Sequence, residues 1–292
     1  MPDIANKRRR PSTVGTILSV NFSTWIRSPR TIIMFCFVLA VSYIRCHSQY
    51  VLFQSLERPY GLLETIACIM FNGCNMTVMS ILYLVTITEL PLRTNFQYSM
   101  LLRTDRKHWT LSQILYCCAM SLFMVVVLLF ICTIILLLLG MSPHCTNQWC
   151  DSILINQNMI EPYDAYVSEY IRLHFSPIQA GLLACFILFL FWFTMTLVIV
   201  LCSINKVPTL GISIYMILLL ANLIFFFEAL GNIPTPIQYS TLDAIISHNS
   251  GEESAGILKT LFGYLIVVAL LQIAIFKSVK RSELTFAKTT SF

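Results

Sequence analysis

The chain has 292 residues, of which 57% are hydrophobic and 11% are charged; its net charge is +5 and its mean hydropathy +0.75. Soluble globular domains contain about 25% charged residues, so this composition excludes a soluble enzyme or binding module. Because the apolar residues gather in long runs, the sequence predicts an all-α membrane protein.

Six apolar runs are long enough to cross a bilayer as helices. A helix rises about 1.5 Å per residue, so about 20 residues cross a hydrocarbon core of about 30 Å. The predicted spans are 31–46, 61–87, 113–140, 178–202, 210–230 and 257–276. They form one membrane domain over 31–276, and no remaining stretch reaches the usual size of a soluble domain, about 100–150 residues.

The segment 1–30 before the first span contains a predicted amphipathic helix. Its apolar residues recur at steps of three and four: Val14, Ile17, Leu18, Phe22, Trp25 and Ile26. We expect this elbow helix to lie in the cytoplasmic membrane interface with Trp25 at headgroup depth, and Ser28-Pro29 to end it. A plain membrane anchor is an equally good interpretation.

The distribution of Lys and Arg predicts that both termini are cytoplasmic. With an inner N-terminus, the cytoplasmic segments are 1–30, 88–112, 203–209 and 277–292, and they contain fifteen of the 19 basic residues. Cytoplasmic loops of membrane proteins are enriched in Lys and Arg. The net positive charge is therefore explained by topology, without a nucleic-acid partner.

The cytoplasmic segment 88–112 has the most distinctive loop sequence. Pro91 ends the second span, and Phe96, Met100 and Arg103 share one helical face before the basic stretch that ends at Trp109. A short basic helix with one aromatic residue suits docking onto a soluble partner. A solvated turn held inside by its positive charges explains the segment equally well.

Two longer segments, 141–177 and 231–256, are predicted on the outer side. The first contains Cys145 and Cys150, which could form a disulfide; the small loop that they would close leaves this open. Most other cysteines lie within the spans, where they act as small apolar residues. His144 adds too few ligands for a metal site, so no metal is predicted.

The spans contain few polar residues and no enzyme signature. Zinc, nucleophile-elbow and phosphate-loop motifs are all absent from the sequence, so the chain is not expected to be an enzyme or to hydrolyse ATP itself. Polar groups at membrane depth suggest a substrate pathway, for which the candidates are Asn72, Asn75, Asn222 and Glu228. Asparagines in spans more often join helices, and Glu228 also suits a helix end or a dimer contact.

Taken together, the elbow helix, the six spans and the basic loop between spans two and three resemble the ABC-2 type permeases, the membrane subunits of bacterial ATP-binding-cassette exporters. The closest likeness is Thr88–Tyr116, TELPLRTNFQYSMLLRTDRKHWTLSQILY. The long 141–177 segment departs from the simplest members. Export direction and bacterial origin are carried by the resemblance alone. The expected location is the cell membrane, as a multi-pass protein.

The resemblance implies that a coupling helix in this loop docks onto a cytoplasmic ATPase. Carried over to this sequence, the docking residues are Phe96, Met100, Arg103, Asp105, Arg106, Lys107 and Trp109. ATP and Mg²⁺ would be bound by that ATPase and no cofactor by this chain, while a second permease copy or a paralogue would complete the pathway.

A second function class stays open. The chain could be a membrane sensor or accessory subunit that binds a peptide or lipid at its outer loop and signals through a partner. A lipid-processing membrane enzyme is disfavoured, because the five histidines are scattered over loops on both sides.

Overall fold

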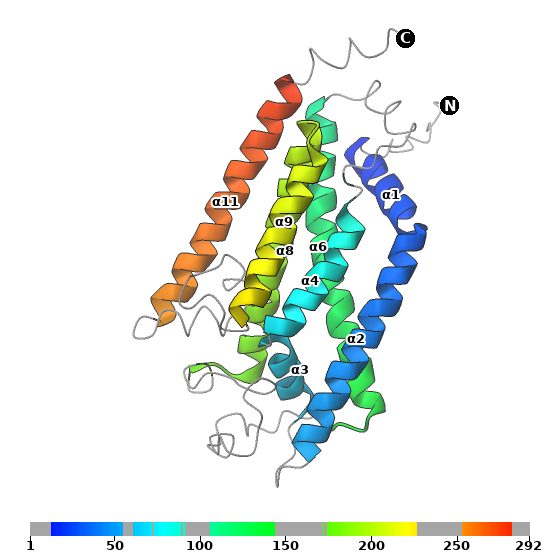
Figure 1. Ribbon diagram of the computed structural model, residues 1–292, viewed down its shortest axis with the longest axis vertical. Coiled ribbons are helices and arrows are strands. Elements are labelled where there is room, and N and C mark those ends of the chain that lie inside the picture. Colours follow the sequence, from blue (N-terminus) through cyan, green and yellow to red (C-terminus); the bar gives the residue numbers. More distant parts are fainter. Residues whose placement is uncertain are drawn as a thin grey trace, which may run out of the picture.

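The computed structural model describes residues 13–54, 61–71, 73–88, 90, 106–143, 171, 174–226 and 253–281, and nearly all of these residues belong to helices (Figure 1). The predicted all-helical class is therefore confirmed for the described part of the chain. The helices are α1 (Thr13–Ile26), α2 (Pro29–Gln54), α3 (Leu62–Phe71), α4 (Gly73–Ile87), α6 (Arg106–Leu138), α8 (Pro177–Ile204), α9 (Pro208–Phe226) and α11 (Glu253–Arg281).

Four of the described helices are long and apolar enough to cross a membrane: α2, α6, α8 and α11. They contain the predicted first, third, fourth and sixth spans. The pair α3 and α4 makes a fifth candidate if both belong to one crossing. The fifth predicted span, 210–230, is not among these candidates, because the apolar part described in α9, Pro208–Ala221, is shorter than a full bilayer crossing of about 20 residues.

The second predicted span is bent, whereas the sequence pattern predicted one continuous helix over 61–87. The axes of α3 and α4 meet at 74°. The sequence at the bend is Asn72-Gly73, and both residues favour helices less than their apolar neighbours do. The backbone N–H of Leu62 donates to the carbonyl of Ser142 at 3.1 Å, which joins the start of α3 to the segment after α6.

Helix α6 begins at Arg106, earlier than the predicted start at residue 113. Neither Gly nor Pro occurs between Arg106 and Leu139, so nothing in the sequence interrupts the helix. It ends at Leu138, two residues before Gly140, whose φ is +89°. The N–H groups of Gly140 and Met141 donate to the carbonyls of Leu137 and Leu136, as in a Schellman motif.

Helix α1 packs against α6 through aromatic side chains. Trp25 is only 4% exposed, and its ring meets those of Phe35 and Phe123 edge-on, with centroids 6.2 and 5.6 Å away. Phe22 meets Tyr116 of α6 in the same way at 5.2 Å. The predicted helix and its break before Pro29 are confirmed, but Trp25 faces the protein instead of the lipid headgroups.

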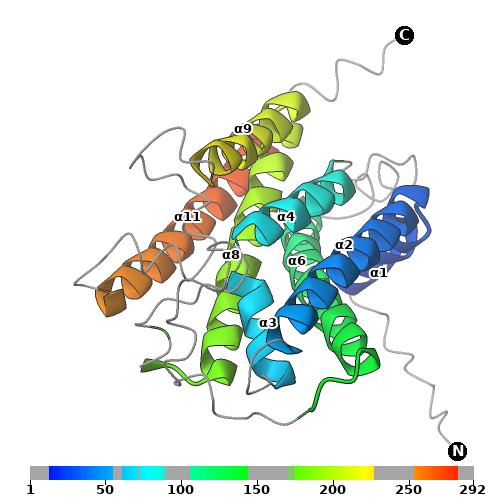
Figure 2. The ribbon, with the colours of Figure 1, turned by 60° about the horizontal axis from the view of Figure 1, so that its bottom comes forward.

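Helix α8 forms the centre of the bundle, as Figure 2 shows. It contacts α3, α6, α9 and α11, and it is the most buried of the long helices. Ser176 caps its start: its hydroxyl accepts from the N–H of Gln179, whose side chain accepts from the N–H of Ser176. Its two-sided burial explains why its sequence is apolar on all faces.

Candidate functional site

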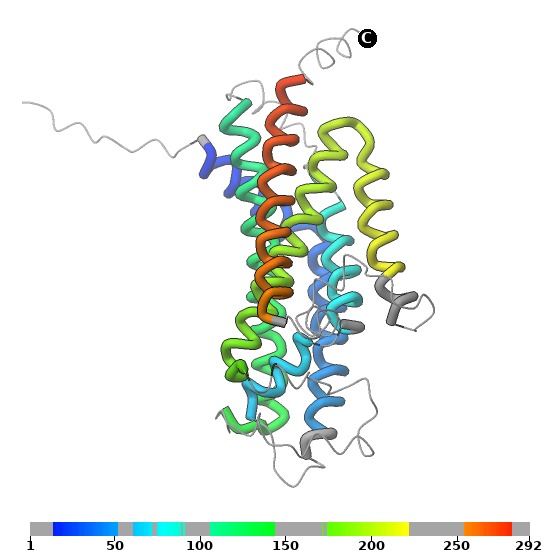
Figure 3. The backbone as a smooth tube through the Cα atoms, turned by 90° about the vertical axis from the view of Figure 1, so that its left-hand side faces the viewer, coloured from blue at the N-terminus to red at the C-terminus, as the bar shows by residue number. Residues whose placement is uncertain are grey.

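Positive charge gathers at one end of the bundle. Of the ten Lys and Arg residues in the described helices and turns, eight belong to the junction of α1 and α2, the start of α6, the turn between α8 and α9, or the end of α11. Figures 1 and 3 place these four places toward the same end of the bundle. The eight residues are Arg27, Arg30, Arg106, Lys107, Lys206, Lys277, Lys280 and Arg281.

The acidic residues within the described helices lie elsewhere. Glu64 is in the first turn of α3 and Glu253 is the first residue of α11, and both helix starts point to the opposite end. The two ends of the bundle therefore differ in charge. Such asymmetry is typical of a polytopic membrane protein whose basic end faces the cytoplasm.

The start of α6 has one buried and one exposed face. Trp109, Thr110 and Gln113 are buried against the bundle, and the Thr110 hydroxyl donates to the Arg106 carbonyl at 2.8 Å. Lys107 and Leu111 are exposed on the other face. The buried face fixes the helix start to the bundle, so its basic face is held in a defined direction.

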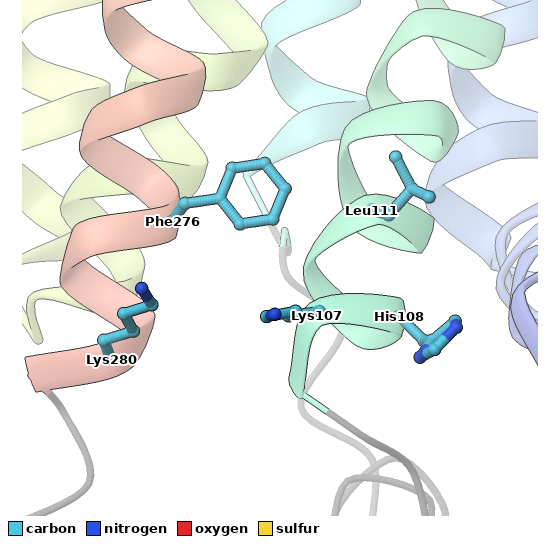
Figure 4. A pocket seen from close by; sticks show the side chains of 5 residues that line it. All are labelled: Lys107, His108, Leu111, Phe276 and Lys280. Atoms are coloured by element: carbon cyan, nitrogen blue, oxygen red, sulfur yellow. The ribbon is translucent and has the colours of Figure 1, made fainter.

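This exposed face forms one wall of an open pocket of about 470 Å³ between the start of α6 and the end of α11. The lining residues are Lys107, His108, Leu111, Phe276 and Lys280. Figure 4 shows Lys107 extending from α6 toward α11, while Phe276 extends from α11 toward α6. The pocket combines two ammonium groups with apolar side chains, and none of the described residues that line it carries a carboxylate.

A second polar group of residues is buried in the middle of the bundle. The Tyr83 hydroxyl on α4 shares hydrogen bonds of 2.8 Å with Ser121 of α6 and with Thr196 of α8. Tyr83 is 0% exposed, so its hydroxyl has exchanged water for these two partners. Three helices are thereby joined at one atom.

Ser80, one turn before Tyr83 on α4, connects this network to α8 and α9. The indole N–H of Trp192 donates to the Ser80 hydroxyl at 2.9 Å, and the Tyr215 hydroxyl of α9 donates to the Ser80 carbonyl at 3.2 Å. The rings of Tyr83 and Trp192 are stacked, with centroids 4.8 Å apart. These bonds fix the registers of four helices and give the network a structural role.

Polar side chains are also buried in α3 and α4, the two helices on either side of the bend. Glu64 and Thr65 are fully buried, and Asn75 and Thr77 are nearly so. Discontinuous helices often line substrate or ion sites in transporters, and a buried carboxyl group at membrane depth is a functional candidate. Within the described residues, no three His, Cys, Asp or Glu side chains gather as a metal site would require.

The predicted site residues fall into two groups. Arg106, Lys107 and Trp109 lie in the first turn of α6, and Asn75 is buried in α4. Asn222 lies on α9, where its side chain is not described. Eight further candidates lie outside the described residues: Asn72, Phe96, Met100, Arg103, Asp105, Cys145, Cys150 and Glu228.

Two features of the site were not predicted from the sequence. The polar groups predicted in the spans were Asn and Glu side chains. Tyr83, Trp192 and Tyr215 were missed, because each has a largely apolar ring with only one polar atom. Lys280 was also missed, because it lies in what was predicted as a plain basic tail. The available signal was a Lys and an apolar residue spaced four residues apart at the basic end of each helix, Lys107 and Leu111 on α6 and Phe276 and Lys280 on α11.

Family models, characterised proteins and solved structures were compared with the chain, and none matches it. The functional assignment therefore rests on the charge, burial and contacts of these helices.

Proposed function

We propose that the chain is the transmembrane permease subunit of an ATP-binding-cassette exporter, forming the substrate pathway as a dimer and coupled to a separate cytoplasmic ATPase. The observation that supports this most strongly is the gathering of basic residues at one end, with the start of α6 among them. In this proposal both termini are cytoplasmic and the chain crosses the membrane six times, with α9 continuing as the fifth crossing.

The start of α6 is a suitable place for the cytoplasmic ATPase to bind and to move the bundle. Helix α6 has 33 residues, which corresponds to a length of about 50 Å, and nothing in its sequence breaks it. Because Trp109 is buried against the bundle, force applied at the basic end is transmitted to packed side chains. The aromatic contacts of Phe22 and Trp25 would make α1 move with α6.

The substrate pathway in this proposal runs along the interface of two copies, near the bend between α3 and α4. Asn75 in α4 and Glu64 at the start of α3 are buried within one bundle, so each bundle would have to open for a substrate to reach them. Asn72, Asn222 and Glu228 would contribute further polar groups. Alternating access follows if closure of the two ATPase subunits shifts groups of helices within each bundle as rigid bodies.

The test is a pull-down of the ATPase that co-purifies with the full chain. We expect the double substitution Arg103→Glu and Arg106→Glu to lower ATPase recovery at least tenfold, because like charges now face each other across the interface. Lys259→Glu, near the start of α11 at the opposite end, is the matched control and should retain the ATPase. Unchanged recovery in the double variant, or no stoichiometric ATPase with the unchanged chain, would contradict the proposal.

A further inference from the structure

In the pocket between α6 and α11, the charged and the apolar side chains lie at different depths along the helix axes. On α6, Leu111 follows Lys107 by four residues; on α11, Phe276 precedes Lys280 by four. Since α6 begins and α11 ends at the basic end, both apolar residues lie one turn, about 6 Å, nearer the middle of the bundle. Figure 4 shows this arrangement, with Leu111 and Phe276 on the same side of the two lysines.

The pocket-lining face of each helix continues toward the middle as an apolar stripe. On α6 the helical spacing places Leu115, Leu122 and Val126 on the same face as Leu111 but nearer the middle of the bundle, and all three are exposed. On α11 the same spacing places Ile273, Ile266 and Phe262 on the face of Phe276 but nearer the middle of the bundle, and these are exposed as well. Exposed apolar stripes on membrane-spanning helices face lipid chains, so the pocket opens toward the bilayer.

We propose that this pocket binds the phosphate headgroup of an anionic phospholipid, with Lys107 and Lys280 pairing with the phosphate and Leu111 and Phe276 contacting the start of the acyl chains. Phosphate is the shared chemistry of a lipid headgroup and of a free phosphate ion. The apolar residues one turn deeper favour the lipid, because a free phosphate ion has no apolar group that could contact them. Basic pockets between membrane helices at the cytoplasmic face commonly hold such headgroups.

This lipid site goes beyond the proposed exporter function and does not rest on it. It requires only that α6 and α11 cross a membrane, which their length and composition support. Long lysine side chains suit the place, since their stems cover apolar surface while their ammonium groups reach the headgroup layer.

The test is a titration of the purified, delipidated full chain with phosphatidylglycerol, read out by native mass spectrometry, with no ATPase present. We expect Lys107→Gln and Lys280→Gln each to weaken binding about fivefold, and the double variant to weaken it at least tenfold, because both lysines pair with the same phosphate and their contributions are coupled. Lys280→Arg should restore binding. Lys277→Gln removes an exposed charge from the same end of α11 but outside the pocket, and should change the affinity less than twofold.

Two further ligands distinguish the sources of phosphate. Phosphatidylcholine with the same acyl chains should bind much more weakly, and excess inorganic phosphate should not displace phosphatidylglycerol. Equal binding of phosphatidylcholine, or an equal loss in Lys277→Gln, would overturn the site. Full displacement by inorganic phosphate would overturn the lipid assignment. Folding of each variant is checked by its unchanged far-ultraviolet circular dichroism.

Discussion

Tyr83 connects three helices through a single hydroxyl group. Its bonds to Ser121 and Thr196 are both 2.8 Å long, and the two partner hydroxyls also lie within hydrogen-bond distance of the carbonyls of Cys117 and Trp192. Because each hydroxyl has one proton, Tyr83 donates to one partner and accepts from the other. Water is absent from the core of a bilayer, so each of these polar atoms depends on its protein partner. Apolar packing alone would allow the helices to shift along one another, whereas these hydrogen bonds fix one register.

We therefore predict that Tyr83→Phe destabilises the bundle by about 1–2 kcal/mol, since two interhelical hydrogen bonds are lost and two hydroxyls keep only their local partners. Unfolding by a denaturing detergent, followed by circular dichroism, measures the change. Tyr43→Phe is the control, because Tyr43 is 51% exposed on α2, and it should alter stability by less than about 0.5 kcal/mol. Equal stability of the two variants would mean that the network contributes nothing.

At the residue scale the sequence could indicate only part of the site. Arg106 and Lys107 could be singled out because basic residues beside an apolar run mark a membrane boundary. Tyr83 and Trp192 could not, because the pairing of Ser80 with Trp192 joins residues 112 positions apart. Such long-range partners follow from the packing of helices, which sequence spacing does not specify.

The pair α8 and α9 shows how one small residue permits close packing of two helices. A Cβ atom placed on Gly211 would come within 3.0 Å of the Cα of Ile199 and 3.1 Å of the Cβ of Cys202. The turn between the helices is tight: Lys206 has a φ of +66°, and the Asn205 side chain donates to the Leu201 carbonyl at 3.0 Å. The two helices therefore approach too closely to admit a larger side chain.

We predict that Gly211→Ala destabilises the chain by about 1–3 kcal/mol, because the added methyl group forces α9 away from the backbone of α8. Gly263→Ala on α11 is the matched control: nothing lies within 4 Å of its added Cβ. The control should be neutral or more stable by up to about 1 kcal/mol, since Ala favours helices more than Gly does. Thermal unfolding in detergent compares them, and equal midpoints would rule out the close packing.

At the element scale, prolines made several boundaries predictable. Pro29, Pro177 and Pro208 each begin a helix, where the missing N–H costs no helical hydrogen bond. The bend between α3 and α4 was not predictable from hydropathy, because a hydropathy window averages over the break at Gly73. The early start of α6 was also missed, because its first turns carry polar residues that continue the helix into the predicted loop.

At the scale of the whole molecule, the two ends differ in both charge and chain connections. The basic end contains the α1–α2 junction and the α8–α9 turn, whereas the other end contains the turn that links α6 to Leu62 through Ser142. Reversing the bundle in the membrane would move eight basic residues of the described helices to the outer side. The positive-inside rule makes that orientation unfavourable.

This orientation is tested by labelling single cysteines with a membrane-impermeant maleimide in intact cells. Arg281→Cys places a thiol at the end of α11, and Pro143→Cys places one just after α6; both positions are exposed. The background has all 11 native cysteines replaced by Ser, so that each introduced thiol is the only one in the chain. We expect Pro143→Cys to react in intact cells and Arg281→Cys to react only after the membrane is opened. The reverse pattern would place the basic end outside, and a cytoplasmic ATPase could then not reach the start of α6.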